Sequence, residues 1–219
     1  IRDSYFPAER LKLTGNPVRQ HLLKLQPDPE EGYRSFEIEK KKKVCLLVGG
    51  SLGARTLNRC FMEGLEKLDR EDLVVLWQCG KYYHSEVESR VKASGLGNIR
   101  LMPFISRMDL AYGVADIIVS RAGALTISEL CIVGKPAILV PSPNVAEDHQ
   151  THNAASLTEK NAALMISDDE AGEKLVDRML ALLEDEAEQK ELSKHIKQLG
   201  IGDASERIAA EVHKILVKQ

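Results

Sequence analysis

Two short stretches of this sequence combine residues that could bind an anion. Residues 49–54 read Gly-Gly-Ser-Leu-Gly-Ala, and residues 120–130 read Ser-Arg-Ala-Gly-Ala-Leu-Thr-Ile-Ser-Glu-Leu. Each follows a pattern typical of a buried strand and opens a predicted helix. The start of a helix presents unpaired backbone N–H groups and the positive end of the helix dipole, and phosphate is its usual ligand. Two such junctions in one chain favour a nucleoside diphosphate as the ligand.

The first junction places Gly50, Ser51 and Gly53 in a turn between a strand and a helix. It has neither the Lys-Ser/Thr ending of a Walker loop nor the spacing of the dinucleotide fingerprint, which argues against ATP hydrolysis and NAD chemistry. Its glycines would let a ligand approach the backbone, and Ser51 offers a hydroxyl. The alternative is a tight turn that binds nothing.

The second junction predicts a sharp turn at Gly123 and free N–H groups on Ala124, Leu125 and Thr126. Thr126 is a candidate for a helix cap or a phosphate contact. Glu129 falls about one and a half turns into the helix, where its carboxylate could bind sugar hydroxyls. The alternative is an acidic residue that only complements the helix dipole.

A third group of polar residues follows the strand that ends near residue 141. Gln150 and Asn153 are neutral donors and acceptors, which suit sugar hydroxyls. His149 and His152 are spaced i, i+3, but a metal site would need further ligands at suitable spacing, so we expect no metal. The alternative for this stretch is a helix start with Asp148 as its cap.

Two single positions complete the candidates. Arg19, in the turn 15–19, carries a planar charged fork that suits a phosphate or a base edge. Ile105, after the strand at 99–102, could line an apolar slot for a flat base and pair with the base edge through its backbone. The alternatives are a surface arginine and an ordinary core residue.

The elements that would position these residues alternate between strand and helix. The strand candidates are short, rich in Val, Ile and Leu and not alternating in polarity, which is typical of strands covered on both faces. They are 44–48, 73–77, 99–102, 116–120, 137–140 and 162–166. Apolar spacing predicts helices over 54–68, 174–183 and 205–217, and the polar stretch 26–43 predicts a surface connection. The pattern predicts an α/β fold, a Rossmann-like doubly wound parallel sheet with ligands beyond the carboxyl ends of the strands.

The bulk composition narrows the function classes. The chain has 219 residues and a net charge of −3, so general affinity for nucleic acid is not implied. Its four cysteines form no C-x-x-C pair and are expected to be reduced and buried. No apolar run reaches the length of a membrane helix, and no signal peptide is visible. Because the chain begins at Ile1 without a Met, we expect a fragment of a longer protein.

Taken together and in this order, five stretches resemble the carboxy-terminal half of the MurG family, the bacterial N-acetylglucosaminyltransferases that make lipid II from lipid I. They are 15–19, 49–54, 103–105, 120–129 and 149–154. The resemblance implies one half of the two-domain GT-B fold. Residues 11–219 would form the carboxy-terminal UDP-GlcNAc-binding domain, and residues 1–10 would be a remnant of the interdomain linker. The amino-terminal acceptor domain would be absent.

The resemblance also implies a role for each candidate residue. Arg19 would contact the nucleotide end of UDP-GlcNAc, Ser51 would hydrogen-bond the diphosphate, and Ile105 would meet uracil through its backbone. Glu129 would bind the ribose hydroxyls, and Gln150 would read hydroxyls of GlcNAc. The diphosphate and sugar region would be lined by Ala124, Leu125, Thr126, Ile127 and Ser128, with Gly50, Gly53, Gly123, His149 and Asn153 nearby.

The implied reaction moves GlcNAc to the 4-hydroxyl of the muramoyl sugar of lipid I with inversion. It uses no cofactor and no metal, and the sequence contains no Asp-x-Asp pair that would hold a divalent ion. The catalytic base, the lipid I site and the contact with the membrane surface are expected on the absent domain. Such a protein would lie peripherally on the cytoplasmic face of the bacterial cell membrane, and its helix 205–217 would pack against that domain.

Three alternatives stay open at this point. One is a related UDP-GlcNAc 2-epimerase, which would share the donor site. Another is a stand-alone donor-binding half that works with a separate membrane-bound partner. The third is a nucleotide-sugar sensor without catalytic activity.

Overall fold

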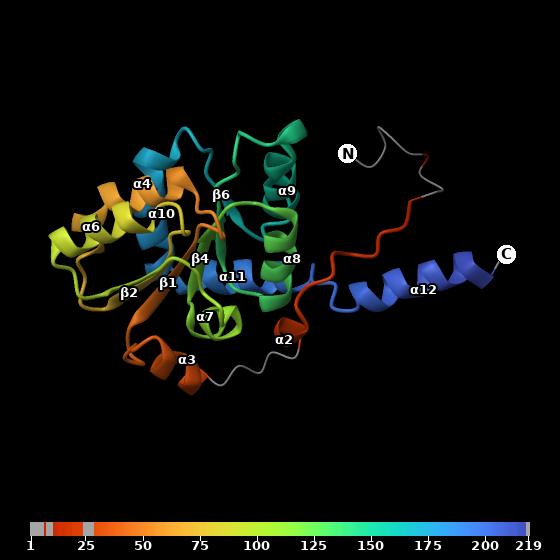
Figure 1. Ribbon diagram of the computed structural model, residues 1–219, viewed down its shortest axis with the longest axis horizontal. Coiled ribbons are helices and arrows are strands. Elements are labelled where there is room, and N and C mark those ends of the chain that lie inside the picture. The colour runs from red at the N-terminus through yellow and green to blue at the C-terminus, as the bar shows by residue number, and fades with distance from the viewer. Residues whose placement is uncertain (1–6, 8–10, 24–28, 218–219) are drawn as a thin grey trace.

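Six parallel strands form the central sheet of the computed structural model, which describes residues 7, 11–23 and 29–217 (Figure 1). The strand order is β3-β2-β1-β4-β5-β6, and every neighbouring pair is parallel. The strands are β1 (Lys43–Val48), β2 (Leu73–Gln78), β3 (Ile99–Met102), β4 (Ile117–Ser120), β5 (Ala137–Leu139) and β6 (Leu164–Met165). All six predicted strands are confirmed, with ends within about two residues of those expected.

Helices connect these strands and cover both faces of the sheet. They are α2 (Gln20–Leu23), α3 (Pro29–Ser35), α4 (Arg55–Glu63), α5 (Leu65–Leu68), α6 (His84–Ser94), α7 (Met108–Val114), α8 (Ala124–Val133), η2 (Ala146–Asp148), α9 (His149–Thr158), α10 (Ala171–Glu184), α11 (Glu186–Lys197) and α12 (Ala204–Val217). Side chains of β1 alternate between two apolar layers. Cys45 and Leu47 pack in the layer beneath α4 and α10, whereas Val44 and Leu46 pack in the layer beneath α7 and α8. The doubly wound fold predicted from the sequence is therefore confirmed.

The neighbours β1 and β4 mark the point where the winding of the sheet reverses. From β1 the chain continues outward through β2 to β3, and from β4 it continues the other way through β5 to β6. The connections after β1 and β4 therefore leave toward opposite faces. The region between them at the carboxyl edge, where sheets of this type bind ligands, is called the crevice below. Both glycine-containing junctions follow these two strands, so the topology places them at this crevice.

The helix predicted over 54–68 is broken in the structure. It consists of α4 and α5, separated by Gly64. A Cβ atom at Gly64 would lie 2.8 Å from Cγ2 of Val176 on α10. The close approach of α10 at this position, which apolar spacing cannot reveal, explains why a glycine interrupts the helix.

The surface connection predicted over 26–43 is wrong in part, although residues 24–28 lie outside the described residues. Residues 29–35 form α3, and this helix packs against α7. A Cβ atom at Gly32 would lie 2.5 Å from Cγ1 of Val114, and Ile38 is only 7% exposed. A long-range contact therefore orders a segment whose polar composition favoured a loop.

Helix α12 projects away from the rest of the fold (Figure 1). Its side chains Val212, Ile215 and Leu216 are 52%, 66% and 65% exposed. The helix that was expected to pack against another domain thus carries an exposed apolar face. The predicted linker remnant 1–10 lies outside the described residues apart from Pro7.

All four cysteines are buried as free thiols, as expected. They are Cys45, Cys60, Cys79 and Cys131. Burial raises the pKa of the Cys79 and Cys131 thiols to about 11. Within the described ranges, the helices are all too short or too polar to span a bilayer.

Candidate active site

The loop after β1 needs its glycines for conformation and for close packing. Gly50 and Gly53 have φ angles of +80° and +93°, in the left-handed region that side chains disfavour. A Cβ atom at Gly53 would lie 2.4 Å from the carbonyl oxygen of Cys79, whereas one at Gly50 would meet no atom within 4 Å. Ser51 is exposed between them. The loop is thus packed on one side and open on the other, where a ligand could reach its backbone.

The start of α8 follows β4 and differs from the prediction in its turn. The N-cap residue is Gly123, with φ −66° and ψ 148°, an extended conformation that any residue adopts. The conformation at Gly123 therefore does not require glycine, contrary to the role predicted for this residue in the turn. A Cβ atom at Gly123 would have a single neighbour, Oγ1 of Thr126 at 3.6 Å. The glycine leaves the first turn of α8 uncovered, and Thr126 does not cap the helix.

Helix α4 also begins without a side-chain cap. Its N-cap residue Ala54 has no side-chain oxygen that could accept a backbone N–H, and the same holds for Gly123 at the start of α8. A helix start without such a partner leaves N–H groups available and carries partial positive charge. Two uncapped helices of nine and ten residues therefore begin at the two sides of the crevice between β1 and β4. The arrangement suits an anion with charge spread over two phosphates.

The carboxylate of Glu129 is fixed by two partners from other elements. The phenol of Tyr112 on α7 donates to Oε2 of Glu129 at 3.1 Å, and Nε of Arg19 lies 3.6 Å from Oε1. Tyr112 is 1% exposed, and burial together with Glu129 raises the pKa of its phenol, which therefore stays a donor. The fold thus brings the predicted residue Arg19 into contact with the predicted residue Glu129 on α8.

The side chain of Gln150, at the start of α9, links the ends of two strands. Its Oε1 accepts the N–H of Ala122 after β4 at 3.2 Å and the N–H of Ser142 after β5 at 3.0 Å. Asn153 donates to the carbonyl of Ala122 at 3.0 Å. Both predicted residues therefore lie beside the start of α8, with the Nε2 group of Gln150 outside these bonds.

The segment before α9 is strained. Glu147 and Asp148 both have left-handed conformations, with φ angles of 54° and 47°, which non-glycine residues adopt at a cost. Asp148 does not cap α9, because its Oδ1 accepts the hydroxyl of Thr151 at 2.7 Å instead of a backbone N–H. His149 contacts the carbonyl of Ala146 at 2.8 Å through Nδ1. No group of three or more His, Cys, Asp or Glu side chains that could hold a metal is found among the described residues.

Ile105 is a core residue whose backbone has a fixed partner. It is 2% exposed, and its N–H donates to Oε1 of the buried Gln78 at 2.9 Å. A base that met this position would therefore find its N–H group already occupied. Ile127 also packs against the core, and Ser128 donates to the carbonyl of Ala124 at 2.9 Å. Ser128 in turn accepts from Asn16 at 3.0 Å, which holds the 15–19 turn against α8.

Sequence reasoning assigned no role to Arg121, which joins three strand ends. Its Nη1 donates to the carbonyls of Val140 and Pro141, both at 3.1 Å, and to the carboxylate of Asp168. Thr56, in the first turn of α4, donates to the same carboxylate at 3.0 Å. An arginine directly after a buried strand was the available signal, but its partner lies 47 residues further along the chain.

These features define a class of protein: a Rossmann-like α/β domain of the type that forms one half of a GT-B glycosyltransferase. The profile of the glycosyltransferase family 28 C-terminal domain matches residues 44–208, and the chain belongs to this family. The crystal structure of MurG from Acinetobacter baumannii is similar, with 30% sequence identity and a TM-score of 0.72 over 88% of this chain and 55% of that one.

Curated relatives are similar over almost the whole chain. A UDP-N-acetylglucosamine--N-acetylmuramyl-(pentapeptide) pyrophosphoryl-undecaprenol N-acetylglucosamine transferase from Parabacteroides distasonis is 46% identical over 99% of this chain and 59% of its own length. The chain therefore spans about three fifths of that relative. A UDP-GlcNAc 2-epimerase from Neisseria meningitidis is 17% identical with a TM-score of 0.61, over 95% of this chain and 56% of that one. At 17% identity the likeness to the epimerase shows a shared fold alone. The sequence of this chain is much more similar to the transferase, at 46% identity.

Proposed function

We propose that this chain binds UDP-GlcNAc and supplies the donor site of a GlcNAc transfer to lipid I. The observation that carries the proposal is the pair of uncapped helix starts, α4 and α8, at the crevice between β1 and β4. The names of relatives such as the Parabacteroides distasonis transferase support the same donor and acceptor. A diphosphate between the two helix starts would meet the N–H groups of both.

The remaining ligand groups would extend from the diphosphate in two directions. Glu129 would accept the ribose hydroxyls, with uracil toward Ile105 and its carbonyl. Arg19, which contacts Glu129, would also reach the nucleotide. Gln150 and Asn153, which bond to the backbone of Ala122 just before α8, would bind GlcNAc, and Ser51 would bind the diphosphate.

The chemistry proposed for this site is stabilisation of the leaving group. Inverting transfer breaks the bond between the sugar and UDP, so negative charge grows on the diphosphate in the transition state. N–H groups already aimed at that position stabilise the charge without reorganising, and such preorganisation often contributes more to catalysis than any other effect. The proposal needs no divalent metal, and we expect donor affinity to be equal in EDTA and in Mg²⁺.

The remaining steps of the reaction are proposed for a longer protein, of the length of the curated relatives. The catalytic base, the lipid I site and attachment to the cytoplasmic face of the membrane are assigned to a region outside this chain. The exposed apolar face of α12 is proposed to pack against that region. The isolated chain is expected to bind the donor without turning it over.

Calorimetric titration of Glu129→Ala with UDP tests the site. Loss of a hydrogen bond to a charged group should weaken UDP and UDP-GlcNAc binding by about 1.5–3 kcal/mol. Glu88→Ala, which removes an exposed carboxylate on α6, is the matched control and should bind like the parent chain. Unchanged affinity of Glu129→Ala would remove this residue from the ribose role.

Gln150→Ala tests the sugar site separately. Because only UDP-GlcNAc carries the sugar, this substitution should weaken UDP-GlcNAc binding more than UDP binding. Equal losses for the two ligands would contradict the assignment. Incubation of the longer protein with UDP-GlcNAc alone distinguishes the epimerase, since an epimerase would convert the donor without any acceptor.

A further inference from the structure

A cavity of about 700 Å³ lies at the amino edge of the sheet, opposite the candidate active site. Its walls come from the connection before β1, from Asp116 before β4, from Lys135 before β5 and from one face of α11. Strand β1 has six residues, so the cavity and the loop after β1 are separated by roughly 20 Å. An occupant of this cavity would therefore not touch a ligand in the crevice between β1 and β4.

The walls of this cavity are strongly basic. Eight lysines line it, against two carboxylates, those of Asp116 and Glu186. The lysines are Lys40–Lys43, Lys135, Lys190, Lys194 and Lys197. The whole chain has a net charge of −3, so this concentration of lysine is not a consequence of a basic composition. A concave surface lined by one sign of charge focuses its field on the space inside.

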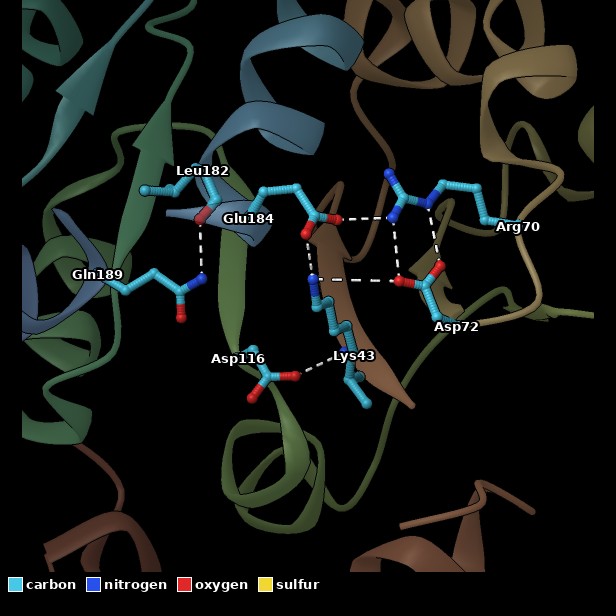
Figure 2. A network of polar contacts seen from close by, with 8 residues as sticks. Lys43, Arg70, Asp72, Asp116, Leu182, Glu184 and Gln189 are labelled. Atoms are coloured by element: carbon cyan, nitrogen blue, oxygen red, sulfur yellow. Dashed lines mark hydrogen bonds and ion pairs between the residues drawn. The ribbon is translucent and has the colours of Figure 1, made fainter. Parts of the chain in front are cut away.

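Five of these lysines have carboxylate partners. Figure 2 shows Lys43 between Glu184 and Asp72 at the rim. The other pairs are Lys40 with Glu30 at 2.5 Å, Lys42 with Glu39 at 3.5 Å, Lys190 with Glu186 at 3.2 Å and Lys194 with Glu191 at 3.8 Å. Lys41, Lys135 and Lys197 have no carboxylate within 4.0 Å among the residues described. Three lysines are thus left to attract an anion.

Lys135 is the most enclosed of the three, since it is half-buried while Lys41 and Lys197 are exposed. Burial lowers its pKa, which reflects the cost of keeping an ammonium group partly out of water. The carboxylate that opposes this pKa shift is that of Asp116, whose Oδ2 accepts the backbone N–H of Val44 at 2.7 Å (Figure 2). That carboxylate is committed to the backbone and offsets Lys135 only in part.

We propose that the lysine-lined cavity binds a small free anion with two or more phosphate groups, at a site separate from the donor site. Three lysines that line one cavity without a carboxylate partner in the described part of the chain match the spread charge of such an anion. The volume falls within the range of small-ligand pockets, roughly 300–1,000 Å³. A flat membrane surface would reach the exposed Lys41 and Lys197 but not the enclosed Lys135, which favours a free anion over a lipid headgroup.

Calorimetric titration with inorganic pyrophosphate tests the proposal, because lysine variants show which site the anion occupies. The parent chain should bind pyrophosphate, and Lys41→Gln/Lys197→Gln should bind it at least tenfold more weakly. Lys92→Gln/Lys174→Gln removes two exposed lysines elsewhere and should bind like the parent chain. Lys135→Gln gives a third comparison, read only if its melting temperature matches that of the parent.

Two results would overturn the proposal directly. One is no pyrophosphate binding by the parent chain, and the other is equal binding by the parent chain and Lys41→Gln/Lys197→Gln. A parallel arm measures sedimentation with vesicles of phosphatidylglycerol and phosphatidylcholine. If this variant loses vesicle binding while pyrophosphate binds to neither protein, the surface contacts lipid headgroups and the free-anion proposal fails.

Discussion

The hydrogen bond from Tyr112 to Glu129 leads to a quantitative prediction for Tyr112→Phe. The donor is 1% exposed and the Glu129 side chain 14% exposed, so both groups are largely removed from water. A hydrogen bond to a charged group contributes about 1.5–3 kcal/mol. Arg19 remains beside Glu129 in the variant, which favours the lower end of that range. We expect the free energy of unfolding to fall by about 1–2 kcal/mol, or roughly 2–8 °C in Tm for a chain of this size.

The same substitution should behave differently when Glu129 is absent. In Glu129→Ala the buried phenol loses its acceptor, which carries its own desolvation cost of about 1–3 kcal/mol. Tyr112→Phe in that background removes the unpaired hydroxyl. Its effect on stability should then be neutral within about 0.5 kcal/mol, or stabilising.

Urea unfolding of the four proteins of this double-mutant cycle measures the coupling. Tyr82→Phe removes a phenol that is 82% exposed and should leave stability unchanged. UDP titration provides a second readout, with affinity expected to fall about fivefold, near 1 kcal/mol, because Glu129 loses the contact that orients it. Additive stability effects in the cycle would refute the reasoning, since they would mean that Tyr112 does not act through Glu129.

Other features of the fold give three further predictions. Asn58→Ala leaves the indole N–H of Trp77 without its acceptor at 2.9 Å and should lower the free energy of unfolding by about 2–4 kcal/mol. Unfolding followed by the fluorescence of this single tryptophan measures the loss. A loss below about 0.5 kcal/mol would contradict the role given to the bond. Burial raises the pKa of Asp116 above its ordinary value of 3.8, so the folded chain binds this proton more tightly than the unfolded chain does. The folded chain therefore loses stability as the pH rises from 3.8 through the raised pKa. Asp116→Asn should therefore gain more stability over the parent at pH 7.5 than at pH 4.5, and a pH-independent difference would oppose this. The four buried thiols should react with a disulfide reagent at pH 8 only after unfolding, and rapid labelling of the native chain would show that the described burial is wrong.

The strands and the strand-helix junctions could be predicted because their signals are local. A run such as Val44–Val48 is apolar without alternation, and this property alone indicates a strand covered on both faces. The placement of Gly50 and Glu129 at the two strand-helix junctions followed from their positions relative to predicted helix starts. For these residues, the local sequence is sufficient to predict the position in the fold.

The features that were predicted wrongly or not predicted from the sequence depend on contacts between distant segments. Gly64 breaks a helix because α10 approaches it, and residues 29–35 become helical against α7. Tyr112 and Gln78 fix Glu129 and Ile105, but nothing in their local sequence indicates a polar partner 17 or 27 residues away. Sequence spacing located the candidate site, whereas the residues that hold its groups in place required the folded chain.

Under the proposed function, the two backbone bonds to Gln150 would restrict the kind of sugar group that this side chain could contact. Its oxygen faces the N–H groups of Ala122 and Ser142, so a flipped amide would set NH₂ against two donors. Gln150 can therefore only donate to a ligand, which must present a lone pair. A stereoisomer that turned a C–H bond toward it would leave a donor without an acceptor, at a cost of about 1–3 kcal/mol. Selectivity at this position would thus come from the penalty on the wrong sugar more than from attraction to the right one.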